Sequence, residues 1–457
     1  MAPKIEIKNG TEKLTSNSGL AIVGAILDNT ELKNRVNEDN PAISRVNGFS
    51  NSDILLPMIG LISMGKPDFE AIEGFREDPF FLAALGLDNC PSSPCLRQRL
   101  DCIGTSYNDI IKEESIRIIR HTASSLGPIN TSCGLFIPLD IDVSPFDNSK
   151  TKKEGVSRTY KGHDGYAPIF AYLGTEGYLV NTELREGKQH CQKNTPDFIN
   201  ETIKYARQIT DAPILVRLDS GNDSKDNFPA LMQPGIEFII KRNMRRQPPG
   251  PLIEKAKATG TEIPCREGKR RWIGKTQTDI NGNPLDFPII FDVTERTSRK
   301  GQQLVFPEYE IDTYWCSLAG LDAKEVIHLY HDHGTSEQFH SELKTDMDIE
   351  RLPSSRFSTN SLILVLGMLS YNVLRIIGQQ SIIEGEHASQ TVKRIYRKKV
   401  SRRRIRTVMQ DMIYVAGRLI RRSRKWFLSL GSINPFADLW QRVYEHFRSK
   451  HLQLSNT

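Results

Sequence analysis

A run of mostly apolar residues at positions 135–144 is interrupted by carboxylates at alternate positions, which predicts a short β-strand. Side chains in a strand alternate between its two faces, so Asp140, Asp142 and Ser144 are expected to share one face. Two carboxylates on one face of a buried strand repel each other and are costly to desolvate, and a divalent cation such as Mg²⁺ removes that cost. The pattern therefore predicts a metal site, with a solvated strand end as the alternative.

The apolar pattern downstream predicts the rest of a sheet. Residues 166–173 and 177–184 are rich in β-forming residues and flank a short turn, which predicts a hairpin. Residues 197–209 have helical periodicity, and residues 212–219 form a nearly continuous apolar run that suits a strand buried on both faces. A further strand is predicted at 235–243.

The order strand, hairpin, helix, strand predicts where two of the acids meet. A strand that returns through a helix to the same sheet tends to lie parallel to its predecessor. We therefore place the strand at 212–219 beside the strand at 135–144, with Asp219 at its carboxyl end near Asp142. Because α/β sheets bind ligands at the carboxyl ends of parallel strands, this placement strengthens the metal-site prediction.

Helical spacing of apolar residues dominates residues 1–125, for example at 19–27 and 53–64. A further helix is predicted to begin near residue 94, with Arg97 and Arg99 close to its start. These arginines would contact DNA if the segment were a reading helix, and a solvated helix start is the alternative. We predict that residues 1–125 are a helical domain and a candidate for binding DNA ends.

The sheet unit predicted at 126–245 is followed by a segment of different character. Residues 246–320 show short alternating runs and no long helix, which predicts a β-rich insertion; the runs are at 271–276, 287–294, 302–309 and 311–318. Helical periodicity resumes at Leu321, and residues 321–385 are predicted to complete the sheet unit. The apolar run within them, residues 362–377, contains polar residues and predicts a buried helix rather than a membrane span.

Tyr330, His333, Glu337 and Lys344 follow one another at steps of three, four and seven residues, which places them on one stripe of a helix. A solvated, salt-rich helix face is the alternative. Because this is the next long helix after the predicted sheet, it can pack over the sheet and present Glu337 to the two aspartates. A zinc site at the nearby histidines is disfavoured, since their spacing matches no standard ligand pattern.

Residues 386–457 begin with a dense basic stretch and are predicted to be a helical C-terminal unit that contacts DNA or mediates dimerisation. Asp411 is the only acid between residues 391 and 425, so counter-ion release from phosphates is the expected use of this surface. The cations are Lys393, Arg394, Arg397, Lys398, Lys399, Arg402, Arg403, Arg404, Arg406, Arg418, Arg421, Arg422, Arg424 and Lys425.

Composition adds limits rather than a function. The 457 residues are too many for one compact core, and 38% hydrophobic with 25% charged residues is typical of a soluble globular protein. Seven dispersed cysteines argue against a disulfide framework and fit a reducing compartment. The N-terminus has no apolar core typical of a signal peptide, so we expect a cytoplasmic, nucleoid-associated protein.

The order of elements, with Asp142 and Asp219 on two strands and Glu337 on a late helix, resembles the ribonuclease-H-like core of DDE transposases. The segment Tyr330-x2-His333-x3-Glu337-x6-Lys344 is similar to the Tyr-x2-Arg-x3-Glu-x6-Lys signature of bacterial cut-and-paste insertion-sequence transposases. His333 stands where that signature has arginine.

The surroundings of the two aspartates are also similar to those of the first and second catalytic Asp in that group. Asp142 is followed by Val and Ser, and Asp219 by Ser and Gly. Asp142 is preferred as the first catalytic residue because Asp-x-Ser/Thr follows the pattern of the group, with Asp140 as the alternative. The fold implied by the resemblance is α/β: a ribonuclease-H-like mixed sheet with helices, interrupted by a β-rich insertion and flanked by helical units.

The resemblance implies a two-metal mechanism. Asp142, Asp219 and Glu337 would hold two Mg²⁺ ions, for which Mn²⁺ can substitute, about 3.5–4 Å apart. Lys344 and His333 would hold phosphates, and Tyr330 would contact the DNA backbone. Members of the group cut the second strand through a hairpin with a flipped base, for which Trp315 or Tyr314 is a candidate platform, with ordinary core packing as the alternative.

These implications lead to one hypothesis and two competitors. The hypothesis is a transposase that binds the inverted-repeat ends of an insertion sequence, excises it and joins it to target DNA, acting as a homodimer on double-stranded DNA. One competitor is a non-catalytic DNA-binding regulator that uses the basic C-terminal unit. The other is a metal-dependent DNA nuclease that does not transfer strands.

Overall fold

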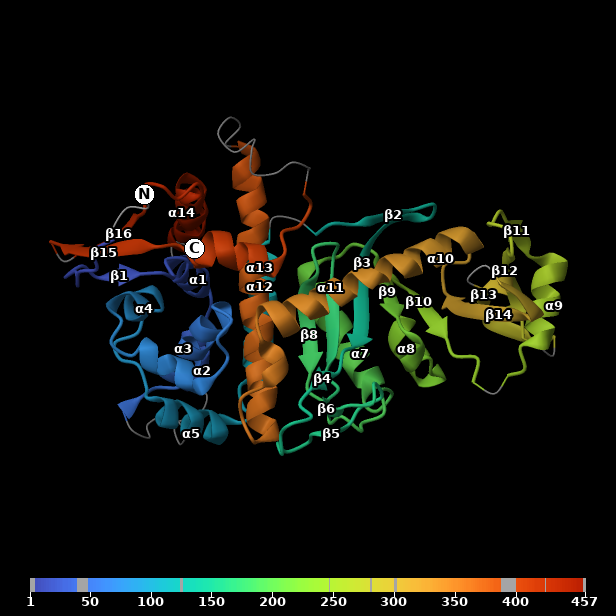
Figure 1. Cartoon of the computed structure of the whole chain (residues 1–457), viewed down its shortest axis with the longest axis horizontal. Helices are drawn as coiled ribbons and strands as arrows, with labels where there is room; N and C mark the ends of the chain where they lie inside the picture. Colours follow the sequence, from blue (N-terminus) through green and yellow to red (C-terminus); the bar gives the residue numbers. More distant parts are fainter. Residues whose placement is uncertain are drawn as a thin grey trace. The chain divides into compact units, whose positions relative to one another are not determined.

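The computed structural model describes residues 5–38, 48–123, 126–245, 247–279, 282–299, 302–387, 400–423 and 425–454. The chain divides into two compact units, each described here by itself (Figure 1). One unit is residues Ser125–Ser341, and the other combines Met1–Ser124 with Glu342–Thr457.

The unit at Ser125–Ser341 is built on a mixed sheet that contains the predicted strands. Its strands include β3 (Gly134–Val143), β7 (Ile169–Leu173), β8 (Tyr178–Glu183), β9 (Ile214–Leu218) and β10 (Ile236–Arg242). They lie in the order β10-β9-β3-β7-β8. β3 pairs with β9 in parallel and with β7 antiparallel, and β9 and β10 are parallel. The hairpin β7–β8 and the parallel neighbours β3 and β9 are thus confirmed.

The connection between β8 and β9 contains the helix that makes the parallel pairing possible. This helix, α7 (Thr195–Ile209), has proline in its first turn and buries Phe198, Ile199 and Ile203 on one face. Short elements complete the connections: β2 (Ile129–Thr131), β4 (Phe146–Asp147), β5 (Ser157–Arg158), β6 (Asp164–Tyr166) and α8 (Phe228–Leu231), with 3₁₀ turns at Ser220–Asn222 and Lys225–Asn227.

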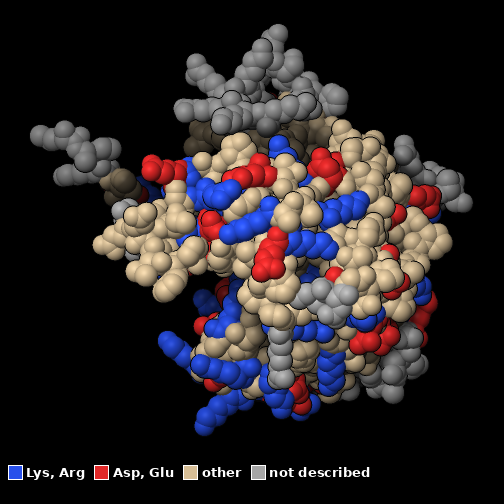
Figure 2. Space-filling model, turned by 90° about the vertical axis from the view of Figure 1, so that its right-hand side faces the viewer, with Lys and Arg blue, Asp and Glu red and all other residues tan. Residues whose placement is uncertain are grey.

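The β-rich segment continues the same sheet beyond β10. Its elements are α9 (Gly250–Thr259), β11 (Thr261–Ile263), β12 (Lys269–Thr278), β13 (Pro284–Arg299) and β14 (Gln302–Cys316). β14 pairs antiparallel with β10, so the order runs β11-β12-β13-β14-β10. In Figure 2, basic and acidic residues are intermixed on the face that is shown. Within this segment, ion pairs such as Arg271 with Asp292 join residues of opposite charge.

Two details of this segment differ from the sequence prediction. The run at 302–309 and most of the run at 311–318 belong to one strand that ends at Cys316, because Glu310, which separates them, is paired with Thr294 in the ladder with β13. Glu310 also forms an ion pair with Arg296 of β13 at 2.8 Å. The helix α9 was not predicted, since the segment was expected to be β-rich without a long helix; its Gly-Pro start fits the preference for proline in the first helical turn. Ala256 of α9 packs on Trp272 and Phe291 of the sheet.

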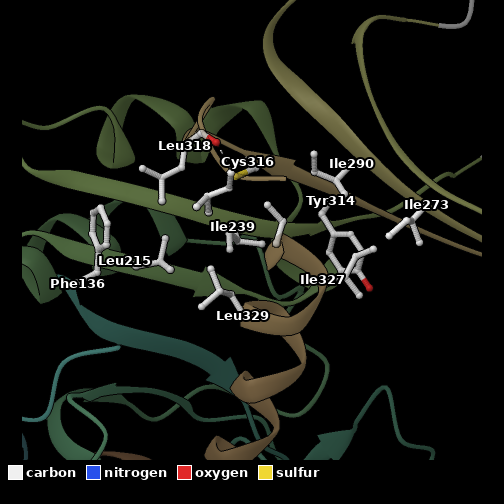
Figure 3. Close-up of a cluster of buried hydrophobic side chains, with 12 residues drawn as sticks. Phe136, Leu215, Ile239, Ile273, Ile290, Tyr314, Cys316, Leu318, Ile327 and Leu329 are labelled. Atoms are coloured by element: carbon white, nitrogen blue, oxygen red, sulfur yellow. Dashed lines mark hydrogen bonds between the residues drawn. The ribbon is translucent and has the colours of Figure 1, made fainter. Parts of the chain in front are cut away.

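Helix α10 (Ala323–His331) packs on the sheet and closes the main core of this unit (Figure 3). Side chains from β3, β9, β10 and the β12–β14 strands meet the apolar face of the helix, so one cluster joins the predicted insertion to the first strand. The cluster is Phe136, Leu215, Ile239, Ile273, Ile290, Tyr314, Cys316, Leu318, Leu321, Val326, Ile327 and Leu329.

The single helix predicted to carry Tyr330 to Lys344 is interrupted. After α10 come a 3₁₀ turn at Asp332–Gly334, α11 (Thr335–Ser341), and a π-helical turn at Glu342–Asp346. Gly334 disfavours a continuous helix by about 1 kcal/mol relative to alanine, and the buried side chain of His333 binds within the sheet unit instead of following the stripe. The four residues therefore do not share one regular stripe, which corrects the prediction.

The second unit is mainly helical. Its helices are α1 (Leu20–Leu27), α2 (Leu32–Glu38), α3 (Ser52–Ser63), α4 (Pro79–Ala84), α5 (Ser93–Ile103), α6 (Asn108–Thr122), α12 (Phe357–His387), α13 (Ile405–Val408) and α14 (Ala437–Leu454), with shorter helical turns at Phe69–Gly74, Ile349–Arg351 and Met409–Ile413. Helix formation in residues 1–125 is thus confirmed.

Helix α12 is the centre of this unit. Within the described residues it is the one helix long and apolar enough to cross a membrane, but 94% of its most apolar window, within Phe357–Gly385, is buried inside the protein. It packs against α3 and α6. The prediction of a buried helix at 362–377 is confirmed.

The C-terminal segment is only partly helical, which corrects the prediction for 386–457. Residues Gly417–Arg422 (β15) and Lys425–Leu430 (β16) form an antiparallel hairpin, and β1 (Leu14–Thr15) pairs with β15. Apolar residues of the two strands meet across the hairpin, as in the pairs Leu419 with Leu428 and Ile420 with Phe427. The cations of 391–399 and Arg424 lie outside the described residues.

Candidate active site

Asp142 and Asp219 lie at the carboxyl ends of two adjacent parallel strands. Ile141 of β3 is paired with Leu218 of β9, so the residue that follows each is one of the two aspartates. Asp142 accepts a hydrogen bond from its neighbouring backbone N–H of Val143 at 2.8 Å, and Asp219 accepts one from the side chain of Asn222 at 2.6 Å. The predicted meeting of these two acids is present in the structure.

The two carboxylates affect each other's protonation. Burial, together with the charge of Asp142, raises the pKa of Asp219 to about 6. Burial also acts to raise the pKa of Asp142, but hydrogen bonding and charge from His340, with the charge of His333, outweigh it and lower that pKa. Repulsion between neighbouring carboxylates is the condition that a bound cation relieves.

Asp140 has a different environment from Asp142, although the two share a strand face. Arg217 of β9 forms a bidentate ion pair with it, with Nε to Oδ1 at 2.6 Å and Nη2 to Oδ2 at 2.8 Å. His333 Nδ1 lies 3.0 Å from the same Oδ1. Both oxygens of this buried carboxylate are therefore already neutralised, which favours Asp142 as the acid able to bind a cation.

His333 occupies the position of the arginine in the transposase signature and is almost fully buried. Burial lowers its pKa, but the charge of Asp140 and the hydrogen bond to it, together with the charge of Asp142, raise the pKa overall. A raised pKa favours the imidazolium, so His333 keeps part of the positive charge that arginine would supply. In this structure that charge is directed at Asp140 rather than toward solvent.

His340 contacts Asp142 directly. Its Nε2 lies 3.3 Å from Asp142 Oδ2, and its Nδ1 lies 3.3 Å from the hydroxyl of Tyr172. The ring is packed between Phe170 and Tyr172, with centroids 5.2 and 5.3 Å away. The chain Tyr172–His340–Asp142 fixes the orientation of the carboxylate, as partners behind a metal ligand commonly do.

His340 is one of the histidines near Glu337 for which a zinc site was disfavoured, and its contact with Asp142 was not predicted. A signal was available, because His340 follows Glu337 by three residues and residues at that spacing share a helix face. Tyr160 was missed as well. Its hydroxyl donates to Val143 O at 3.2 Å, and burial with the charges of Asp142 and Asp219 raises its pKa, which places the phenol beside the two acids.

Glu337 is exposed on α11, one helical turn before His340. Within the described ranges, no group of three His, Cys, Asp or Glu side chains is close enough to hold a metal ion. The third carboxylate is therefore not gathered with Asp142 and Asp219 in this arrangement, and its role as a metal ligand stays a prediction.

The aromatic candidates are packed inside the sheet unit. The ring of Tyr330 lies 4.9 Å from that of Tyr314, which is fully buried. Trp315 donates its indole N–H to Asp223 at 2.9 Å, and Arg242 lies over its ring at 5.3 Å. The alternative of ordinary packing describes Tyr314, which is buried. Trp315 is partly exposed, and its role as a base platform stays a prediction.

Several cations predicted to contact DNA lie in the helical unit and have carboxylate partners in that same unit. Lys344 Nζ lies 3.0 Å from Glu350, Arg402 donates to Glu342 at 2.7 Å, and Arg404 donates to Asp346 at 2.8 Å. Arg403 is buried and paired with Asp411. Within the protein these arginines are paired with acids, and those of Arg402 and Arg404 lie far away in sequence. Arg404 remains half exposed, and the contact of the three arginines with DNA stays a prediction.

The two N-terminal arginines also differ from the prediction. Arg99 is 2% exposed and donates to Asn51 at 2.9 Å, so it braces the helical core and cannot reach DNA from this position. Arg97 is half exposed and pairs with Glu70, and its guanidinium lies over the ring of Phe69. The partner of Arg99, Asn51, lies 48 residues away along the chain, so the helix start alone gave no sign of this contact.

Comparison with known families decides the identity of the chain. The profile of the family described as "Transposase DDE domain group 1" matches residues 1–452. The chain belongs to this DDE transposase family. It is therefore a transposase, an enzyme of the polynucleotidyl transferase class, and enzymes of this family generally use divalent metal ions.

Other comparisons add little to the family assignment. No curated protein matches the chain. Among solved structures, "Cryo-EM structure of piggyBac transposase synaptic complex with hairpin DNA (SNHP)" matches with 10% identity and a TM-score of 0.41, covering 97% of this chain and 84% of that chain. A TM-score of that size does not establish a shared fold.

Proposed function

We propose that this transposase mobilises a bacterial insertion sequence by Mg²⁺-dependent cleavage and strand transfer at inverted-repeat DNA ends. The observation that carries the proposal is the placement of Asp142 and Asp219 at the ends of adjacent parallel strands in a chain of the DDE family. The strand order β10-β9-β3-β7-β8 supports a ribonuclease-H-like core, because it joins an antiparallel hairpin edge to parallel strands whose carboxyl ends carry the acids.

The donor set fits a hard divalent cation. Asp142 and Asp219 supply oxygen ligands, and the raised pKa of Asp219 reports the repulsion that a cation would remove. Glu337 is proposed as the third ligand, supported by its place on the same short helix as His340, which contacts Asp142. When bound, a pair of Mg²⁺ ions supplies nucleophile activation and charge neutralisation for in-line displacement at phosphorus.

The side chains of the protein position these ligands. His340 binds Asp142 on one side and Tyr172 on the other, so the carboxylate cannot turn freely. Arg217 and His333 hold Asp140 and leave Asp142 as the acid on this strand that faces the site. Asn222 orients Asp219 through its amide.

Further parts of the proposal concern the reaction as a whole. We include double-stranded DNA as substrate, a hairpin intermediate, a homodimer that holds two ends together, and action at the nucleoid in the cytoplasm. Family membership supports DNA as the substrate. Two element ends must be held together for excision, which is the reason for proposing a dimer.

The experiment compares Asp219→Asn with Asp226→Asn in Mg²⁺-dependent nicking of a duplex that carries the element end. Asp226 is an exposed aspartate of the following loop whose carboxylate bonds to neighbouring Ser224, so the control makes the same charge change outside the site. Wild type and the Asp226 variant should nick and join DNA, and the Asp219 variant should do neither. Cleavage by the Asp219 variant at the wild-type rate would refute the site, and cleavage without joined products would indicate a nuclease.

A further inference from the structure

The hairpin β15–β16 projects from the helical unit as a two-stranded ribbon (Figure 1). β1 pairs with β15 at Gly417 and Arg418, and the N–H of Leu419 donates to Lys13 O at 2.9 Å; beyond Leu419, β15 and β16 pair only with each other within the described residues. The outer half of the hairpin runs from Ile420 to Arg422 and from Lys425 to Phe427. Trp426 and Phe427 of this outer half border a pocket that α14 also lines, with Tyr444 for example, while Arg422 and Lys425 near its tip are exposed.

The charge of the ribbon has one sign. Arg418, Arg421, Arg422 and Lys425 are all exposed, and no acidic residue occurs between Asp411 and Asp438. Glu12, at 3.6 Å from Arg418, is the carboxylate that pairs with the ribbon at its base in the described part of the chain. The outer cations are left without a neutralising acid there.

The register adds a second argument for an external anion. Arg422 lies directly opposite Lys425 in the antiparallel pair. Like charges at opposed positions destabilise a hairpin by up to about 1 kcal/mol. A phosphate bound between Arg422 and Lys425 would attract both side chains. The pair therefore destabilises the hairpin of the free protein, and an anionic partner would remove this repulsion.

Aromatic side chains accompany the cations. Trp426 is 42% exposed and Phe427 is 50% exposed, and the guanidinium of Arg421 lies 5.2 Å from the centre of the Trp426 ring. Because side chains alternate along a strand, Trp426 and Phe427 stand on opposite faces of the ribbon. Cations with exposed aromatics beside them suit a ligand that offers both phosphates and apolar edges.

The other long ribbon of the protein shows that this pattern is not general. β13 and β14 also extend as a hairpin, but Arg296 is paired with Glu310 at 2.8 Å and Arg299 with Glu308 at 3.6 Å. That ribbon neutralises its own cations. The β15–β16 ribbon does not, although both are exposed antiparallel pairs.

We propose that the outer half of β15–β16 is a DNA-binding arm that enters the major groove of duplex DNA. The major groove of B-form DNA admits a two-stranded β-ribbon. Arg422 and Lys425 contact phosphates, while Trp426 and Phe427 contact sugar and base edges. The inference rests on the proposed function for its substrate and assigns a DNA contact to the ribbon, whose outer cations have no carboxylate partner among the described residues, unlike Arg402, Arg403 and Arg404.

The test measures how salt changes the affinity of the full chain for a labelled mixed-sequence DNA duplex, by fluorescence anisotropy. The variant is Arg422→Thr with Lys425→Thr, because threonine favours strands and the change removes the like-charge pair, so the hairpin should fold at least as well. Losing two phosphate contacts should make the slope of log affinity against log salt less steep by about 1.8. Between 50 and 200 mM salt the loss of affinity should then be roughly tenfold smaller than for wild type.

The matched control is Arg296→Thr with Arg299→Thr, which makes the same charge change in the ribbon whose cations are already paired. It should leave the slope unchanged. An unchanged slope in the Arg422/Lys425 variant, or an equal change in the control, would overturn the arm. Trp426→Ala should weaken binding several-fold without changing the slope, and wild-type affinity in this variant would overturn the aromatic contact.

A last comparison separates groove entry from surface attraction. The major groove of duplex RNA is too deep and narrow for side chains to read, so wild type should bind it more weakly and the threonine variant should change that binding less. Equal effects on RNA and DNA would overturn groove entry. Absence of Mg²⁺-dependent nicking by wild type, with the salt effect intact, would refute the proposed function but leave the arm.

Discussion

Replacing Asp219 by asparagine should stabilise the metal-free protein at neutral pH. Burial and the charge of Asp142 raise the pKa of Asp219 from 3.8 to about 6, so the folded state binds this proton more tightly than the unfolded chain does. The stability contributed by this group is then full below the unfolded pKa and falls as pH rises from 3.8 through 6. Above pH 6 the folded protein holds an unfavourable carboxylate.

The size of the effect follows from the shift. A difference of 6 − 3.8, or 2.2, at 1.36 kcal/mol for each pKa unit, gives about 3 kcal/mol as the upper limit at pH 7.5. The introduced asparagine would resemble the protonated acid in shape and would carry no charge, so the variant should recover most of this free energy. Part of it will be lost where the hydrogen bond from Asn222 is less well matched, and we expect a gain of about 1–3 kcal/mol.

The assay must report on the sheet unit, because a chain of two compact units need not unfold in one step. Hydrogen exchange of peptides from β3 and β9 measures local opening in that unit, with intrinsic exchange rates corrected at each pH. In EDTA at pH 7.5 the variant should show stronger protection than wild type, and at pH 4 the two should be equal. Adding Mg²⁺ should increase protection in wild type and not in the variant.

The exposed Asp226→Asn variant provides the control, and it should match wild type at every pH. Equal protection of wild type and the Asp219 variant at pH 7.5 would refute the reasoning, since the repulsion between Asp142 and Asp219 would then be absent. Greater protection at pH 4 than at pH 7.5 in both proteins would assign the pH dependence to other groups.

Three further outcomes follow from the geometry. His340→Gln should lower the affinity for Mn²⁺ by about 10–100-fold, measured by calorimetry, because it removes the partner that orients a metal ligand. Arg217→Met should destabilise the sheet unit by about 3–5 kcal/mol, because it leaves the buried carboxylate of Asp140 without its main counter-ion. Adding Asp140→Asn should restore stability, and hydrogen exchange of β9 measures the stability of the single and the double variant. Gly177→Ala should cost about 2–4 kcal/mol in the same assay, because Gly177 has φ +73° and an added Cβ would overlap the ring of Phe339 on α11.

Much of the sheet could be predicted because its signals are local. The alternation at 135–144 and the apolar run before Asp219 each define a strand, and the helix between them forces the parallel pairing that brings Asp142 and Asp219 together. The residues of each strand also indicate where that strand ends. The position of Asp142 and Asp219 at two neighbouring strand ends could therefore be predicted from short stretches of sequence.

The partners of charged residues could not be predicted in the same way. Arg402 and Arg404 looked like a phosphate surface because the run around them contains one acid, yet Glu342 and Asp346 neutralise them from about 60 positions away. Arg99 likewise binds Asn51 across the helical core. The sign and density of charge along the sequence do not show which acidic or polar side chains the fold places beside a given arginine.

The two histidines explain why the metal site should form at one aspartate of β3 and not at the other. Asp140 has Arg217 on both oxygens and His333 beside one of them, so its charge is compensated before any ion arrives. Asp142 forms an ion pair with His340, accepts a hydrogen bond from Val143 N–H and has a second carboxylate next to it, and the described residues offer Asp219 no ion pair. A divalent cation therefore gains nothing at Asp140, where it would meet two positive groups. At the strand ends it gains the charge of two acids, of which Asp142 is partly balanced by His340 and Asp219 is not balanced by an ion pair within the described residues.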